Sequence, residues 1–276
     1  MDADGTIEDV EIGLLLDGVR QVYGHDFRQY AQASLKRRLR LWLAGSGCAT
    51  FSRAQERLLR EPALFATLLQ GITVHVTDMF RDPPFFLALR RQVLPFLQTY
   101  PFVKIWLAGC ASGEEVYALA ILLHEAGMRG RYRLYATDLS ETVLQQAREG
   151  IYALRQLQAF TRNYQQSGGT AEFSDYYTAR YDHAIVMSAL KENLVFAQHN
   201  LVTDTDIGEM HMVICRNVMI YFQAALKERC LALFDGCLQP GGFLCLGMKE
   251  GLDGRAIAPR YDALAPRLRI YRKRYV

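Results

Sequence analysis

The chain has 276 residues, of which half are hydrophobic and 22% are charged, and its formal net charge is +3. These values exclude a chain that is mainly disordered, because disorder goes with low hydrophobicity and a high net charge. The net charge is too small to indicate nucleic acid by itself, and no stretch approaches the ~18 apolar residues of a membrane span. We therefore expect a globular protein without membrane insertion. Its acidic N-terminus does not resemble a signal peptide, which predicts a cytoplasmic location.

Residues 9–70 have the pattern of a helical region. Leu35, Leu39 and Trp42 recur at i, i+4 and i+7, which places them on one face of a helix. Pro62 indicates the start of a further helix, since proline is favoured in the first turn. The short segment 72–76 shows the only strand-like alternation before about residue 100, and a proline-rich connection with a helix inside it follows.

A basic cluster lies within the predicted helical region. Residues 35–41 read LKRRLRL, with cations at Lys36, Arg37, Arg38 and Arg40. A solvated helix face is the simplest interpretation. The alternative is docking onto an acidic helical partner, where charge speeds and orients the encounter. Nucleic-acid binding is disfavoured, because the cluster is short and has no interleaved aromatic residues.

After residue 100, short apolar runs alternate with helical segments. Strands are predicted at 103–109, 132–138, 194–200, 211–217 and 242–247, and helices at 117–127, 140–150 and 226–238. This alternation predicts an α/β fold, with a parallel sheet covered by helices on both faces. Residues 165–193 break the rhythm and indicate an insertion that includes a small antiparallel piece.

Metal and disulfide chemistry have no support in the sequence. No two of the six cysteines lie at a CxxC spacing, and the six histidines form neither HxxxH nor HExxH. We expect free buried thiols and no metal site.

The first candidate site is the segment after the strand at 103–109. Gly109 and Gly113 allow a tight turn and the close approach of a ligand. Glu114 and Glu115 open the following helix, where they would repel a phosphate and suit a cationic or hydroxyl-rich ligand. Stabilisation of the helix N-terminus is the simpler interpretation of the two glutamates.

Asp138 ends the next strand, a position that commonly accepts hydrogen bonds from ribose hydroxyls. Capping of the next helix, together with Ser140, is its simpler interpretation. A glycine loop with acidic side chains and an aspartate at the next strand end favour S-adenosylmethionine over NAD as the ligand.

Three further segments place polar groups beside apolar runs. Thr77 and Arg81 share a face if their segment is helical, and Arg81 can hold a carboxylate. Arg216 and Asn217 follow the strand at 211–217, and burial of such groups without partners is costly. The segment His199-Asn200-Leu201 also follows a strand.

Together these segments resemble the CheR-type chemoreceptor glutamate O-methyltransferases. The family elements T-x-x-F-R, A-G-C-x-S-G-E-E, A-[TS]-D, N-L and C-R-N-V-x-I-Y-F correspond in order to Thr77–Arg81, Ala108–Glu115, Ala136–Asp138, Asn200–Leu201 and Cys215–Phe222. The resemblance implies an all-α N-terminal domain over 1–75 and a linker over 76–100. It further implies a Rossmann-like seven-stranded methyltransferase domain over 101–276, with a β-subdomain inserted at about 165–193.

The resemblance also implies methyl transfer from S-adenosylmethionine, leaving S-adenosylhomocysteine, to glutamate side chains of methyl-accepting chemotaxis receptors. Arg81 and Tyr221 would lie beside the reacting groups. The cofactor contacts would be His75, Thr77, Arg81, Gly109, Glu114, Glu115, Asp138, Asn200, Leu201, Arg216 and Asn217. The basic cluster would dock on the helical bundle of the receptor, and a monomer is expected.

Two departures from the family pattern leave questions open. His75 stands where the family has asparagine, and residues 247–250 read GMKE in place of G-H-S-E. Two alternatives therefore remain: a methyltransferase for another acidic protein or a small molecule, and a non-catalytic S-adenosylmethionine-binding signalling module. A dehydrogenase is disfavoured, because the glycine loop has the wrong spacing and presents two acids.

Overall fold

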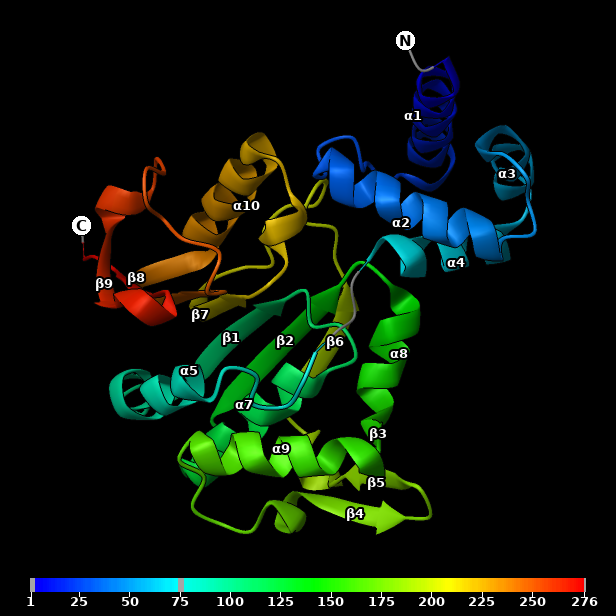
Figure 1. The fold of residues 1–276 in the computed structure, drawn as a ribbon. Helices are drawn as coiled ribbons and strands as arrows, with labels where there is room; N and C mark the ends of the chain where they lie inside the picture. The colour runs from blue at the N-terminus through cyan, green and yellow to red at the C-terminus, as the bar shows by residue number, and fades with distance from the viewer. Residues whose placement is uncertain (1–2, 74–76, 276) are drawn as a thin grey trace. The chain divides into compact units, whose positions relative to one another are not determined.

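The computed structural model describes residues 3–73 and 77–275, which form two compact units (Figure 1). The helical unit comprises Met1–Val74, Asn200–Asp204 and Tyr221–Arg229, and the sheet unit comprises the remainder of the chain. The sequence did not indicate that the two later segments pack with the N-terminal helices. Within the described ranges, no helix combines the length and the apolar character needed to cross a bilayer.

Four helices build the N-terminal part of the helical unit. They are α1 (Ala3–Tyr23), α2 (Gln32–Gly45), α3 (Phe51–Leu58) and α4 (Pro62–Ile72). The predicted face of α2 is confirmed, because Leu35, Leu39 and Trp42 are buried. The indole nitrogen of Trp42 donates a hydrogen bond of 3.0 Å to Thr67 Oγ1, so α2 and α4 are joined by a polar contact as well as by packing.

The strand-like segment 72–76 is wrong at Ile72 and Thr73, which end and cap a helix, and its other three residues lie outside the described ranges. Ile72 is the last residue of α4, and residues 74–76, with His75 among them, lie outside the described ranges. The shared helical face of Thr77 and Arg81 is not formed, because this segment is a turn in which Phe80 and Asp82 have positive φ angles of 53° and 60°.

A seven-stranded sheet forms the centre of the sheet unit, as expected. Its order is β6 (Leu194–Gln198), β2 (Tyr132–Asp138), β1 (Val103–Ala108), β7 (Met210–Cys215), β8 (Leu238–Leu246), β10 (Ile270–Lys273) and β9 (Tyr261–Ala265). The first five are parallel and match the predicted strands, whereas β9 and β10 pair antiparallel and were not located from the sequence. The helices are α5 (Pro83–Ala88), α6 (Leu94–Leu97), α7 (Glu114–Glu125), α8 (Glu141–Glu149), α9 (Leu154–Gln166) and the part of α10 (Ala224–Cys237) from Cys230 onward.

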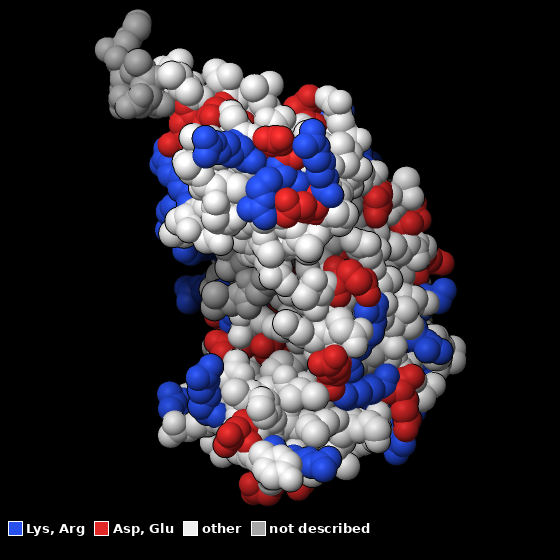
Figure 2. Space-filling model, turned by 90° about the vertical axis from the view of Figure 1, so that its right-hand side faces the viewer, with Lys and Arg blue, Asp and Glu red and all other residues white. Residues whose placement is uncertain are grey.

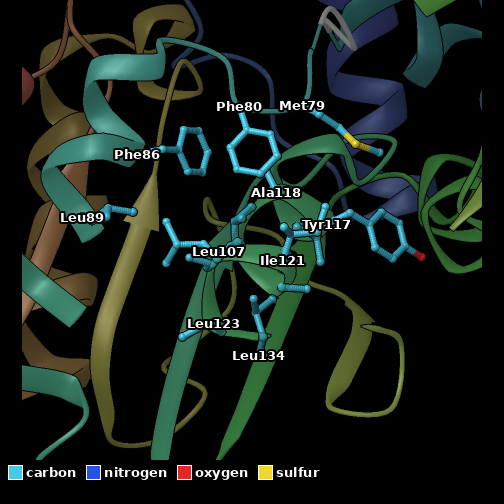
Figure 3. Close-up of a cluster of buried hydrophobic side chains, with 14 of the residues drawn as sticks. Met79, Phe80, Phe86, Leu89, Leu107, Tyr117, Ala118, Ile121, Leu123 and Leu134 are labelled. Carbon is cyan, nitrogen blue, oxygen red and sulfur yellow. The ribbon is translucent and has the colours of Figure 1, made fainter. Parts of the chain in front are cut away.

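The alternation of side chains along β1 shows that helices cover both faces of the sheet. Leu107 lies in the apolar cluster drawn in Figure 3, together with Ala118 and Ile121 of α7. The neighbouring Trp106 points to the opposite face, where its ring lies 5.4 Å from that of Phe234 in α10. Burial of β1 on both faces explains its nearly continuous run of apolar residues.

A second, three-stranded antiparallel sheet has the order β3 (Ile151–Ala153), β5 (His183–Val186) and β4 (Tyr177–Arg180). The predicted insertion, 165–193, holds β4 and β5, whereas β3 precedes it and α9 lies between. Glu125, at the end of α7, accepts hydrogen bonds from the hydroxyls of Tyr164 and Tyr176, the second at 2.8 Å. This carboxylate joins α7 to the segment around the small sheet.

Candidate functional site

The candidate site lies where β1, β2 and β7 end. β1 stands between β2 and β7 in the sheet: the chain runs from β1 to β2 on one side, and later returns from β6 to β7 on the other side of β1. In open α/β sheets, ligands bind at the carboxyl ends of the strands at such a switch point. The predicted residues Gly109, Asp138 and Arg216 directly follow or end these three strands.

Asp138 holds the glycine loop against β2. Its Oδ2 accepts a hydrogen bond of 2.9 Å from the Ala111 amide, and its Oδ1 accepts one of 3.1 Å from the Ser140 amide. Asp138 therefore accepts a hydrogen bond at the start of α8, as its simpler interpretation predicted. The Ser140 side chain itself makes no capping hydrogen bond to α8. A carboxylate has about four lone-pair sites, so each oxygen retains capacity for a ligand hydroxyl.

Gly109 is required by its surroundings. Its φ is +79°, and a Cβ atom built on it would lie 2.4 Å from Cγ2 of Val218. The loop after β1 therefore passes against the loop after β7 with no room for a side chain.

Glu114 is buried at the start of α7, with only 4% of its surface exposed. The Ser112 hydroxyl donates a hydrogen bond of 2.7 Å to its Oε2. Burial raises the pKa of the Glu114 carboxyl to about 7, and the nearby charge of Asp78 acts in the same direction. A carboxyl that titrates near neutral pH at a strand end is typical of a ligand site.

Arg216 is the centre of an ion-pair cluster. Its Nη1 lies 2.6 Å from Glu115 Oε1, and its Nη2 lies 2.6 Å from Asp82 Oδ2. Nη2 also donates to the Arg81 carbonyl at 3.3 Å, and Cζ lies 4.0 Å from the ring centroid of Phe85. The side chain is only 1% exposed. Arg216 therefore ties α7 to the Arg81 turn.

Glu250 anchors the loop after β7. Its Oε2 accepts hydrogen bonds from the Asn217 and Gly247 amides at 2.9 and 2.8 Å, and its Oε1 accepts from those of Val218 and Ile220 at 3.1 Å. Burial raises the pKa of Glu250, while hydrogen bonds from backbone amides, those of Asn217 and Gly247 first among them, oppose the shift. Asn217 has a φ of 60°, which asparagine tolerates better than most residues.

The GMKE segment thereby acquires a role that the sequence left open. The two positions that depart from the family pattern, Met248 and Lys249, are exposed, whereas Gly247 and Glu250 are buried. A Cβ on Gly247 would lie 2.5 Å from Glu250 Oε2 and 2.7 Å from the Asn217 amide. The two side chains that differ from the family pattern therefore lie outside the hydrogen bonds by which Glu250 holds the loop after β7.

The remaining predicted residues are placed as follows. Thr77 is half-buried in the sheet unit. Asn200, Leu201 and Tyr221 belong to the helical unit. Asn200 Oδ1 accepts a bond of 3.0 Å from the Val202 amide and so shapes its own turn, and Leu201 is buried. The sequence analysis did not identify Asp82 as a partner of Arg216, nor Glu250 as the acceptor for the loop after β7. The position of an acid directly after Arg81 could have indicated Asp82.

Comparison with known proteins assigns both units. The model described as CheR methyltransferase, SAM binding domain, matches residues 75–260, and the model for the CheR methyltransferase all-alpha domain matches residues 11–73. The chain belongs to the CheR methyltransferase family. It is accordingly an S-adenosylmethionine-dependent methyltransferase with an all-α N-terminal domain, as the resemblance implied.

Similar proteins cover almost the same length. Cher3 of Pseudomonas putida is 46% identical over 265 residues, which are 96% of this chain and 97% of that protein. A chemotaxis protein methyltransferase of Listeria monocytogenes is 30% identical, over 84% of this chain and 86% of its own. Chemotaxis protein methyltransferase 2 of Pseudomonas aeruginosa is 31% identical, over 80% of this chain and 78% of its own. These similarities connect this CheR-family member with chemotaxis.

Proposed function

We propose that the chain transfers the methyl group of S-adenosylmethionine to glutamate side chains of methyl-accepting chemotaxis receptors. The observation that carries the proposal is the pair of carboxylates, Glu114 and Asp138, beside the loop of Gly109. Such a site suits a ligand with positive charge and ribose hydroxyls, which the cofactor has. The names of the similar chemotaxis methyltransferases support the receptor as substrate.

The proposed reaction needs orientation more than acid–base chemistry. The cofactor, when bound, supplies a methyl group activated by a sulfonium. A glutamate with a pKa of about 4.3 is already ionised at neutral pH, so no general base is required. Arg81 and Tyr221 are each proposed to orient either the acceptor carboxylate or the methionine moiety of the cofactor, and orientation would account for most of the acceleration.

Helix α2 is proposed to dock on the receptor bundle. Two of its cations are already paired within the helical unit, Lys36 with Asp9 at 2.6 Å and Arg40 with Glu8 at 2.7 Å, while Arg37 is exposed. Such partly exposed pairs contribute about 0–1 kcal/mol, so an acidic receptor surface can replace the intramolecular partners. Figure 2 shows positive and negative side chains interspersed over the face that it presents.

The proposed substrate is tested by transfer of labelled methyl to a panel of chemoreceptor cytoplasmic fragments, followed by release in mild base. Label that is released by base identifies a carboxyl methyl ester and supports the proposal. Cofactor binding without transfer to any receptor would contradict it and would favour another substrate or a non-catalytic module.

Arg81→Ala is expected to lower kcat/KM for the receptor about 100-fold, because a misplaced acceptor loses most of the benefit of orientation. The turn itself remains tied through the Arg81 carbonyl, which accepts from Arg216. The midpoint of urea unfolding should therefore change little. Steady-state rates and unfolding curves of the same preparations check this, and a parallel loss of both would contradict the assigned role.

Glu114→Gln is expected to remove a pH dependence of cofactor binding. With a pKa of about 7, wild-type Glu114 is mostly protonated at pH 6 and mostly ionised at pH 8. A cationic ligand prefers the ionised form, so affinity should rise about tenfold between these values and one proton should be released below pH 7. Calorimetric titration in buffers of different ionisation enthalpy measures both. Equal pH profiles for the two proteins would exclude this role of Glu114.

A further inference from the structure

Tyr152 of the small antiparallel sheet reaches the glycine loop that follows β1. It lies in β3, is 5% exposed, and its hydroxyl donates a hydrogen bond of 2.9 Å to the Ser112 carbonyl. Both residues belong to the sheet unit. The small sheet is therefore tied, within one unit, to the loop that carries the candidate cofactor site.

The glycine loop has a backbone conformation that needs support. Ala111 has a φ of 48°, where a Cβ atom is crowded, and Gly113 has a φ of 90°. Such conformations persist where the surrounding contacts fix them. β2 supplies one contact, since Asp138 accepts a hydrogen bond from the Ala111 amide. β3 supplies another, since Tyr152 donates to the Ser112 carbonyl.

The Tyr152 side chain fits closely between the loop and its neighbours. A Cβ atom on Gly113 would lie 3.3 Å from the Tyr152 hydroxyl and 2.9 Å from Cβ of Ala147 in α8. The ring of Tyr152 lies edge to face with those of Tyr117 and Phe160, at centroid distances of 6.1 and 5.9 Å. Because this aromatic packing fixes the ring, the hydroxyl is presented to the loop at a defined position.

Ser112 connects this contact to Glu114. Its own hydroxyl donates a hydrogen bond of 2.7 Å to Glu114 Oε2. This bond favours the ionised carboxylate and opposes the rise in pKa that burial causes. Asp78, Cys110 and Tyr152 are the other titratable groups that interact with the charge of Glu114. Burial raises the pKa of Tyr152 well above its usual value, so its phenol remains a donor over the range in which Glu114 titrates.

We propose that Tyr152 is a positioning residue for S-adenosylmethionine: its hydroxyl fixes Ser112, and Ser112 in turn holds the Glu114 carboxylate in the state that binds the cationic cofactor. The inference rests on the part of the proposed function that gives Glu114 a role in cofactor binding, and it is independent of the methyl acceptor. One strand of the small sheet thus supports the cofactor site.

Binding of S-adenosylmethionine to Tyr152→Phe, measured by calorimetric titration at pH 7 and pH 9, tests the inference. Phenylalanine keeps the ring and removes the hydroxyl, so Ser112 is released and Glu114 becomes harder to ionise. The dissociation constant should rise about fivefold at pH 7, as expected for one lost hydrogen bond. At pH 9 it should approach the wild-type value, because Glu114 is then ionised in both proteins. No loss at pH 7, or an equal loss at both pH values, would overturn the proposal.

Tyr176→Phe is the matched control. It removes another buried tyrosine hydroxyl, which donates a hydrogen bond of 2.8 Å to Glu125 at the opposite end of α7. Its affinity for the cofactor should equal that of wild type at both pH values, and a loss like that of Tyr152→Phe would overturn the inference.

Ser112→Ala tests the connection between Tyr152 and Glu114 independently. It removes the hydroxyl that donates to Glu114, so it should reproduce the loss of affinity at pH 7. Adding Tyr152→Phe to Ser112→Ala should cause little further loss, because both changes act through the same hydrogen bond. Additive losses would overturn the proposed connection.

A carboxyl titration without cofactor separates this inference from the wider proposal. NMR of protein with isotope-labelled glutamate follows the Glu114 carboxyl, whose resonance is assigned with Glu114→Gln. Its titration midpoint should lie higher in Tyr152→Phe than in wild type. If wild-type affinity changes with pH but the two midpoints are equal, only the inference on Tyr152 is overturned. If wild-type affinity does not change with pH, the role proposed for Glu114 is refuted, and with it the positioning by Tyr152. Neither measurement involves a receptor, so an absence of receptor methylation would refute the proposed substrate alone.

Discussion

Arg216→Met is expected to lower the free energy of unfolding of the sheet unit by about 3–5 kcal/mol, because removing one partner of a buried ion pair leaves the other charge uncompensated. Glu115 is 12% exposed in the ion pair and has no other acid–base partner at hydrogen-bond distance among the described residues. Asp82 is 39% exposed, so water can compensate part of its loss. Urea unfolding monitored by circular dichroism measures the change.

Two variants show whether charge or packing is responsible. Arg216→Lys keeps the charge but not the fork that reaches two carboxylates, so an intermediate loss is expected. In the double variant Arg216→Met/Glu115→Gln the orphaned charge is removed, and about half of the lost stability should return. If the double variant is no more stable than Arg216→Met, desolvation of Glu115 is not the cause.

The parallel strands and their helices could be predicted because periodicity is a local property. Runs such as 103–109 are apolar throughout, as burial on both faces requires. The antiparallel pair β9 and β10 escaped prediction, since Tyr261–Ala265 and Ile270–Lys273 are short and mix charged with apolar residues. Their pairing depends on a neighbouring strand that a local pattern does not reveal.

The place of the candidate site followed from the sequence, whereas its internal contacts did not. Residues at the ends of parallel strands meet at one edge, so Asp138 and Arg216 could be grouped in advance. The partners of Arg216 lie 101 and 134 residues away in the chain, and such pairs depend on tertiary packing.

The spacing of the cations in the basic cluster of α2 predicts which of them share a face of the helix. Lys36 and Arg40 are four residues apart and share a face of the helix. Arg38 is rotated by about 200° around the helix axis from Lys36, so it lies on a different face. The structure accordingly pairs the first two with α1 and places Arg38 over Tyr221. Helical periodicity thus separates the surroundings of Arg38 from those of Lys36 and Arg40.

Glu250→Ala is expected to destabilise the sheet unit by about 3 kcal/mol or more. The carboxylate is the acceptor for four backbone amides, and each buried amide left without an acceptor costs about 1–3 kcal/mol, part of which water recovers on entering the space vacated. The Asn217 turn should loosen as well, so cofactor affinity should fall together with stability. Thermal unfolding and calorimetric binding on one preparation measure the two effects.

A conservative variant at Glu250 and variants at its exposed neighbours show whether the buried carboxylate is responsible for the loss of stability. Glu250→Gln keeps one acceptor oxygen but turns an NH₂ group toward two amide donors, so it should lose about half as much stability as alanine. Met248→Ala and Lys249→Ala remove exposed side chains, and each should stay within about 0.5 kcal/mol of wild type. If these two variants were as damaging as Glu250→Ala, the loop would be acting through its surface and not through the buried carboxylate. The tolerance expected at residues 248 and 249 also explains how the family's G-H-S-E can become GMKE while the loop after β7 keeps its anchor.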